Sequence, residues 1–158
     1  PCLNDVSVQV VGGPVHLVVD GLGFYAPQNR VMAKHRTQYG TFGIDFVAVN
    51  ALDQFTTSFA FHPPLSTGLI VPEIVFAGFP STPNCPGSIS NPSANPGYLC
   101  FYETANLNVD QWCVSHQLGS WLCFSGSPVL DPIGVGLKIT AINPGRSASM
   151  GVWAVTEP

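Results

Sequence analysis

Residues Phe79–Glu103 read FPSTPNCPGSISNPSANPGYLCFYE. Two cysteines, Cys85 and Cys100, enclose a run rich in proline, serine and asparagine that shows no hydrophobic periodicity. Such a run predicts a long loop, and a disulfide between the two cysteines closes it at its base. Closing a loop of roughly fifteen residues stabilises the folded chain by about 3 kcal/mol, because it restricts the unfolded chain.

The segments on both sides of this loop alternate in the manner of β-strands, with apolar side chains on one face. The alternating segments are Phe42–Phe46, Phe55–Phe61, Tyr98–Tyr102, Gln111–Val114, Trp121–Phe124, Val135–Ala141 and Val152–Thr156. The apolar run Leu69–Phe79 contains Pro72, which predicts an edge strand. Turn residues separate the segments and helix-start signals are scarce. The sequence therefore predicts an all-β fold, an antiparallel β-sandwich of the jelly-roll kind.

The first 27 residues are predicted to form a separate β-hairpin. Two alternating runs flank a Gly12-Gly13-Pro14 turn, and their inward residues are Val6, Val8, Val10, Val15, Leu17 and Val19. Residues 28–38, QNRVMAKHRTQ, are the one charge run and predict a linker or a short helix. We therefore divide the chain into a joining segment, 1–27, and a sandwich domain, 28–158. A hairpin alone is marginal, so it needs a neighbour's open sheet edge or a preceding domain to pack on.

Charge is scarce in this chain of 158 residues. Charged residues make up 9% of it and hydrophobic residues 46%, whereas ordinary soluble domains carry about 25% charged residues. Surfaces with few charges and exposed apolar groups tend to associate, which favours burial in an assembly; the alternative is an exported monomer with a Ser- and Asn-rich coat. The net charge of −4 and the lack of an extended basic patch argue against a nucleic-acid partner. No run has the length of a membrane-spanning helix.

Five cysteines without a CxxC pair favour an oxidising, extracellular compartment. Cys113 and Cys123 flank SHQLGSWL between two strand-like runs and predict a second, hairpin disulfide. Cys2 is then left over, either unpaired or bonded to another molecule, and other pairings stay open.

Two stretches resemble exported bacterial proteins. VHLVVDGLGFYAP resembles a VHLVVDVxGYF-like motif of secreted and surface proteins of Gram-positive and related bacteria. CPGSISNPSANPGYLCFYE, followed by GVGLKITA and GVWAVTEP, resembles a CPG…PGxLCxYE…GxWAVT module at the C-terminus of uncharacterised exported bacterial proteins, over about residues 30–158. The resemblance implies an extracellular β module, without known catalytic residues. Similarity to jelly-roll trimers of the C1q/TNF type is an analogy of fold alone.

The sequence gives little support for a catalytic site or a metal site. Cys113, His116, Cys123 and His62 supply only half of a zinc pattern, so we expect no metal and no cofactor. Ser125 in FSGSPVL resembles the nucleophile of chymotrypsin-like proteases, with His35 or His62 as base and Asp45, Asp53 or Asp110 as its partner. Cys123-Phe124 stand where that family has Gly-Asp, and a turn between strands explains the same string. Glycosidase chemistry needs two carboxylates across a cleft, and no spacing selects Asp45 with Asp53 or Glu73 with Glu103. We therefore predict a protein that is not an enzyme.

The sequence favours a secreted structural or adhesive module of a cell-surface assembly, self-associating through apolar, low-charge surfaces and the N-terminal strands. The alternative is a carbohydrate- or ligand-binding module. For that alternative, Tyr98, Tyr102 and Trp112 neighbour the loop between Cys85 and Cys100, and we expect them to form an exposed aromatic platform. A serine hydrolase is the third hypothesis.

Overall fold

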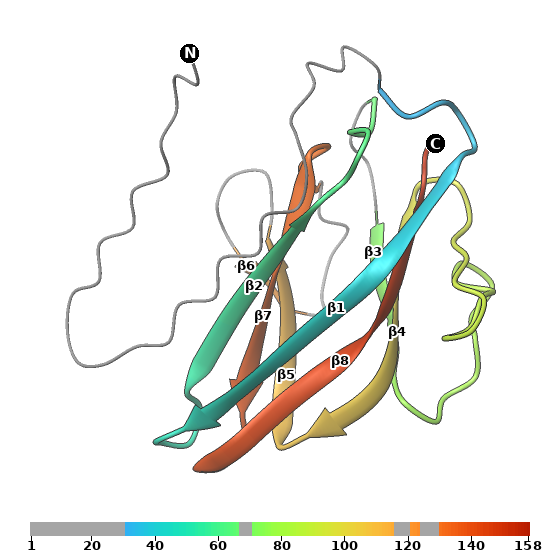
Figure 1. The fold of residues 1–158 in the computed structure, drawn as a ribbon. Coiled ribbons are helices and arrows are strands. Elements are labelled where there is room, and N and C mark those ends of the chain that lie inside the picture. The colour runs from blue at the N-terminus through green and yellow to red at the C-terminus, as the bar shows by residue number, and fades with distance from the viewer. Residues whose placement is uncertain (1–30, 67–70, 116–120, 124–129) are drawn as a thin grey trace, which may run out of the picture.

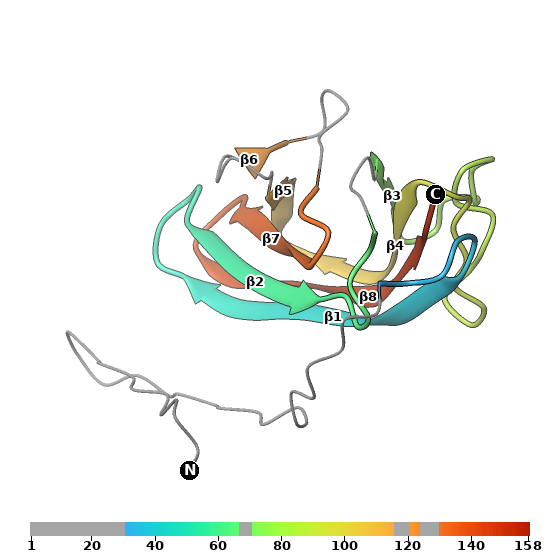
Figure 2. The same ribbon diagram turned by 90° about the horizontal axis from the view of Figure 1, so that it is seen from above.

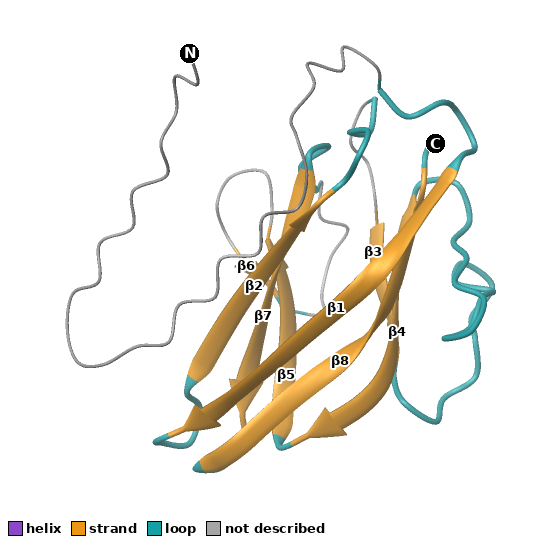
Figure 3. Cartoon of the chain, viewed as in Figure 1, coloured by secondary structure: helices purple, strands orange, loops and turns teal. Residues whose placement is uncertain are grey.

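The computed structural model describes residues 31–66, 71–115, 121–123 and 130–158, which form two packed β-sheets (Figure 1). The strands are β1 (Thr37–Ala48), β2 (Gln54–Ala60), β3 (Val71–Val75), β4 (Tyr98–Leu107), β5 (Val109–Ser115), β6 (Trp121–Leu122), β7 (Gly134–Ala141) and β8 (Gly145–Thr156). Sheet A has the strand order β1-β8-β4-β3, and sheet B has the order β2-β7-β5-β6. The described residues contain no helix (Figure 3). The all-β sandwich predicted from the sequence is confirmed.

The chain changes sheet at each of three short connections. β1 and β2, β4 and β5, and β7 and β8 are consecutive in the sequence but lie in opposite sheets, as the view from above shows (Figure 2). This alternation is the winding of a jelly roll. β3 departs from it, because it pairs in parallel with β4 at the edge of sheet A. Pro72 lies in β3, so the predicted edge position is correct.

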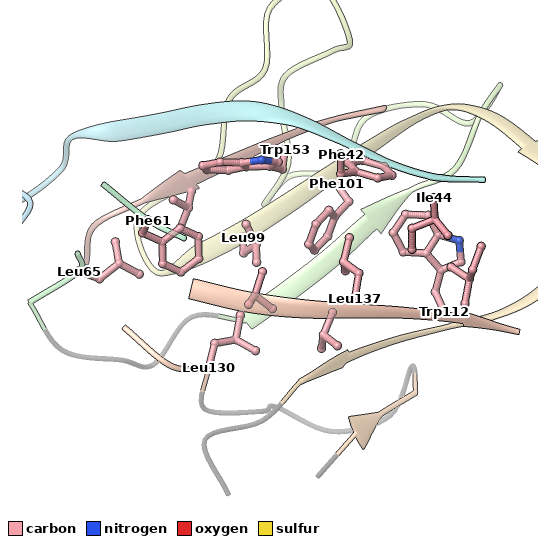
Figure 4. Close-up of a cluster of buried hydrophobic side chains, with 14 of the residues drawn as sticks. Phe42, Ile44, Phe61, Leu65, Leu99, Phe101, Trp112, Leu130, Leu137 and Trp153 are labelled. Atoms are coloured by element: carbon pink, nitrogen blue, oxygen red, sulfur yellow. The ribbon is translucent and has the colours of Figure 1, made fainter. Parts of the chain in front are cut away.

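The inward faces of the two sheets follow the alternation in the sequence. Val135, Leu137, Ile139 and Ala141 of β7 are all buried, as predicted. Aromatic rings from both sheets meet in the middle (Figure 4). Phe42 of β1 packs edge to face on Trp112 of β5 with ring centroids 5.2 Å apart. Burial of such aromatic side chains provides much of the free energy that holds the sheets together.

Gly151 allows β8 to pass close to its two neighbours. A Cβ atom at this position would lie 2.1 Å from the carbonyl oxygen of Tyr102 and 2.9 Å from the ring of Phe42. Any larger side chain would therefore push β4 or β1 away from β8.

Several predicted boundaries need correction; β1 and β4, for example, are longer than the predicted Phe42–Phe46 and Tyr98–Tyr102. The segment at 28–38 is not a helix where it is described: residues 31–36 are irregular, and Thr37 already starts β1. Met32 anchors this segment, since its side chain is buried and its N–H donates to the Pro64 carbonyl at 2.7 Å. β8 begins at Gly145 rather than Val152, because its first half faces the core with small residues such as Ser147 and Ser149 that lack a hydrophobic pattern. β6 ends at Leu122.

The clipped loop, residues 76–97, covers part of the outer face of sheet A beside β4 (Figure 1). The Cys85–Cys100 disulfide ties it to β4, with Cα atoms 5.6 Å apart. Both sulfurs belong to a second hydrophobic cluster on the outer face of the sheet, made of Val75, Cys85, Ala94, Cys100, Tyr102 and Ala154. The first half of β4, residues 99–103, is therefore buried on both faces, whereas residues 104–107 are exposed. A second disulfide, Cys113–Cys123, joins β5 to the residue after β6.

Candidate functional site

One end of the sandwich carries a cluster of exposed apolar side chains. The turns β1–β2, β4–β5 and β7–β8 meet there, at the lower end in Figure 1, and hydrogen bonds join them. Ile142 N–H donates to the Asn108 carbonyl at 3.1 Å, and Leu52 N–H donates to the Ala141 carbonyl at 3.0 Å. We call this surface the apolar end; its exposed residues are Val49, Leu52, Phe55, Leu107 and Ile142.

The β1–β2 turn is held rigidly although it displays apolar groups. The Asp53 carboxylate accepts the N–H groups of Val49 and Asn50 at 2.8 and 2.9 Å. These hydrogen bonds, that of Asn50 first, lower the pKa of Asp53 from its ordinary value. Leu52 has a φ of 66° and is 64% exposed. A left-handed conformation disfavours a leucine by about 1–2 kcal/mol, so the turn stores strain while presenting this side chain to solvent.

The outer face of β1 leads away from the apolar end. Its side chains Tyr39 and Val47 are 70% and 74% exposed. Asp45 lies between them and pairs with Arg146 of β8, with N–O distances of 3.0 and 2.6 Å. The Arg146 hydrogen bond holds the pKa of Asp45 below its ordinary value. The ion pair is exposed and internally neutral, so it leaves this face without a net charge.

The predicted platform of Tyr98, Tyr102 and Trp112 is wrong. Tyr102 is 2% exposed beneath the clipped loop, and Trp112 is 1% exposed between the two sheets. Tyr98 is half buried against the outer cluster. The three residues lie near the loop in sequence, but β4 and β5 belong to different sheets, so their side chains cannot share one surface. Burial raises the pKa of the Tyr102 phenol.

A different aromatic residue lies on the outer face of sheet B. Trp121 of β6 is 37% exposed, and its ring extends over β7, where a Cβ atom at Gly136 would lie 3.2 Å from it. The Lys138 ammonium lies 5.2 Å from the centre of this ring. Thr56 and Ser58 of β2 are exposed on the same face, which follows from the pairing of β2 with β7.

The residues proposed for hydrolysis do not meet in the described part of the chain. Ser125 and His116 lie outside the described residues. Asp45 pairs with Arg146, and Asp53 holds the β1–β2 turn. His35 and His62 are exposed at the opposite end of β1 and β2, so they cannot act with either aspartate. Glu103 is buried and its carboxylate accepts hydrogen bonds from Ser149 at 2.6 Å and Asn106 at 3.0 Å. These contacts give Glu103 a structural role.

The described ranges contain neither a metal-binding arrangement of side chains nor a membrane-spanning helix. No group of three or more His, Cys, Asp or Glu side chains is arranged there to hold a metal ion. No described helix is long and apolar enough to cross a membrane. Cys2 and the expected assembly residues Val6, Val8, Val10, Val15, Leu17 and Val19 lie outside the described residues.

Sequence reasoning missed the apolar end, although a signal was present. The β1–β2 turn reads VNALDQ, and turns normally carry polar residues and glycine rather than valine and leucine. Comparison with known proteins adds no assignment: no protein-family model, no curated protein and no solved structure matches this chain.

Proposed function

We propose that this protein is a structural or adhesive module of an extracellular, cell-surface assembly and that it associates with copies of itself. The single observation that carries the proposal is the apolar end. Five large apolar side chains are exposed there: three lie on the β1–β2 and β7–β8 turns, and Phe55 and Leu107 lie at the adjoining ends of β2 and β4. Backbone hydrogen bonds and the Asp53 carboxylate hold these turns in place. Contiguous exposed apolar surface on an ordered scaffold is typical of protein contacts.

The backbone conformation of Leu52 also supports the proposed self-association through the apolar end. A strained backbone conformation persists only where the surroundings enforce it, and such sites are often functional. A turn selected for stability alone would place glycine or asparagine at a φ of 66°. Here the strained position presents a leucine to solvent, which benefits the protein if another molecule covers it.

The disulfides support the extracellular part of the proposal. Disulfides persist in oxidising compartments and are rare in the cytosol. Both disulfides here are structural, since they tie the clipped loop to β4 and β6 to β5. The predicted N-terminal strands remain part of the proposal as a further joining element.

Static light scattering tests self-association directly. We expect a mass well above the 16.8 kDa of one chain, and a lower mass for Val49→Asp/Ile142→Asp, because two carboxylates at the apolar end oppose burial. The matched control is Phe79→Asp/Ile133→Asp, which adds the same charge at two exposed sites, one in the clipped loop and one before β7, that do not belong to the apolar end. A monodisperse monomer at every concentration, or equal masses for both variants, would overturn the proposal. Repeating the measurement with reductant shows whether Cys2 contributes.

A carbohydrate-binding module is the second candidate, favoured by Trp121. Its partly exposed ring lies beside hydroxyl side chains and Lys138 on the outer face of sheet B, and aromatic faces stack on sugar rings in such modules. Binding on a glycan array that disappears in Trp121→Ala, with Tyr39→Ala as control, would establish it. A blank array would exclude it for the sugars present.

A further inference from the structure

β1 is an edge strand with an open side. It pairs with β8 through twelve consecutive residue pairs, from Thr37–Thr156 to Ala48–Gly145. Among the described strands, none pairs with its other side. The backbone N–H and C=O groups on that side are a template for another strand.

The protections that natural edge strands carry are missing from β1. Lysine, proline, a bulge or a short strand normally prevents pairing between molecules. β1 reads TQYGTFGIDFVA, contains neither lysine nor proline, and has no shift in its register with β8. Its one charged residue, Asp45, is neutralised by Arg146. The other edge of sheet A differs, because β3 is five residues long and contains Pro72.

We infer that β1 pairs antiparallel with β1 of a second copy, about a two-fold axis at Gly43, and so joins two A sheets into one. The inference rests on the proposed self-association and names its contact. The register places Gly43 opposite Gly43, Thr41 opposite Asp45, and Tyr39 opposite Val47.

Exposure and charge select this register. Tyr39 and Val47 are the most exposed large apolar side chains on the outer face of β1, and the axis at Gly43 brings them together twice. Aromatic and β-branched residues are favourable cross-strand partners. Glycine at the axis avoids a clash between identical side chains, and each Asp45 faces a threonine rather than the other Asp45. A shift by two residues separates the Tyr39–Val47 pairs, and a shift by one turns the inward residues to the surface.

Disulfide trapping tests the register. In a Cys2→Ser background, Gly43→Cys places two thiols at the axis, where directly opposed Cα atoms lie about 4.5–5.5 Å apart, a distance that a disulfide spans. Gly43 tolerates the change, since a Cβ atom there has its nearest neighbour at 4.0 Å. The matched control Thr41→Cys lies four residues from its own copy in this register, about 13 Å away, too far for a disulfide. On oxidation with copper phenanthroline we expect a covalent dimer from Gly43→Cys alone. Equal cross-linking of both variants, or of neither, would overturn the register.

A charge variant separates the β1 contact from self-association in general. Tyr39→Lys/Val47→Lys places like charges opposite each other across the contact, and we expect the dimer dissociation constant to rise about tenfold or more. Both side chains are largely exposed, so the fold is retained, as an unchanged thermal midpoint verifies. The control Phe79→Lys/Ile133→Lys adds the same charge elsewhere. If the wild type is monomeric, the proposed function itself fails. If the wild type associates and the β1 variant associates equally well, only the inference fails.

Discussion

Replacing Tyr102 by phenylalanine removes one oxygen atom and tests how the clipped loop is held on sheet A. The Tyr102 hydroxyl accepts the Gly87 N–H at 2.9 Å and donates to the Ser93 carbonyl. The two partners flank the turn that the hydrogen bonds between Ser88 and Asn91 close. The ring itself keeps its place in the outer cluster, because phenylalanine has the same shape without the hydroxyl.

The expected loss of stability follows from the two partners. A buried polar group left without a hydrogen bond costs about 1–3 kcal/mol. Gly87 and Ser93 are only half buried, so we take the lower value for each and expect the free energy of unfolding to fall by about 2 kcal/mol. For a chain of this length, that loss lowers the melting temperature by about 4–8 °C.

Guanidinium unfolding under oxidising conditions measures the difference, with Tyr39→Phe as the matched control. Tyr39 is largely exposed, so its hydroxyl exchanges one hydrogen bond to water for another, and its loss should change stability by no more than about 0.5 kcal/mol. Equal midpoints for the two variants would refute the reasoning, since the Tyr102 hydroxyl would then contribute no more than an exposed one.

The same residue predicts a pH dependence. Burial raises the pKa of Tyr102 in the folded chain, so the folded state holds its proton more tightly than the unfolded state does. Its contribution to stability is complete below the unfolded value of about 10 and is lost as the pH rises through the higher folded value. We expect Tyr102→Phe to lose less stability than the wild type does above about pH 10.

The other predictions concern the disulfide, the strained turn and the N-terminal segment. Cys85→Ala/Cys100→Ala should lower the free energy of unfolding by about 3 kcal/mol, as measured by guanidinium unfolding. A smaller loss than that of Tyr102→Phe would show that the disulfide stabilises the clipped loop less than the Tyr102 hydroxyl does. Leu52→Asn should raise stability by about 1 kcal/mol, because asparagine tolerates a positive φ, and should lower the scattering mass, because an apolar contact is removed; an unchanged mass would show that Leu52 is outside the contact. Removal of residues 1–27 should leave a folded sandwich and lower the mass of the assembly, because one of its proposed joining elements is lost. An unchanged mass would show that the N-terminal segment does not join copies.

The sequence predicts the strands well wherever one face is buried and the other is exposed. β7 is the clearest example, since its four inward residues follow the pattern without exception. Pro72 identifies an edge for a physical reason, since a proline cannot donate a ladder hydrogen bond. The two expected disulfides form, although the cysteine spacing alone left other pairings open.

The candidate surface is harder to predict, because exposure depends on what covers a strand. Tyr102 and Cys100 alternate with Leu99 and Phe101, so the pattern marks them as outward facing. They are nevertheless buried, since the clipped loop folds over that side of sheet A. The alternation of residues within β4 cannot predict that a loop elsewhere in the sequence covers one of its faces. Conversely, Tyr39 and Val47 lie on the same sheet, beyond the outer cluster that the loop covers, and stay exposed.

Geometry links the two proposed contacts into one mode of assembly. Pairing of β1 about a two-fold axis uses the same surface on both copies and therefore closes at a dimer. Because the paired strands are antiparallel, the apolar ends of the two copies point in opposite directions and remain free. Contact between apolar ends then joins one dimer to the next, and alternating two-fold contacts of two kinds produce a linear array. In such an array like charges would recur at every contact and repel one another. The chain keeps this repulsion small, because only 9% of its residues are charged. A lysine in β1 would remove one of these two contacts and a polar β1–β2 turn would remove the other, so either change alone would limit assembly to a dimer.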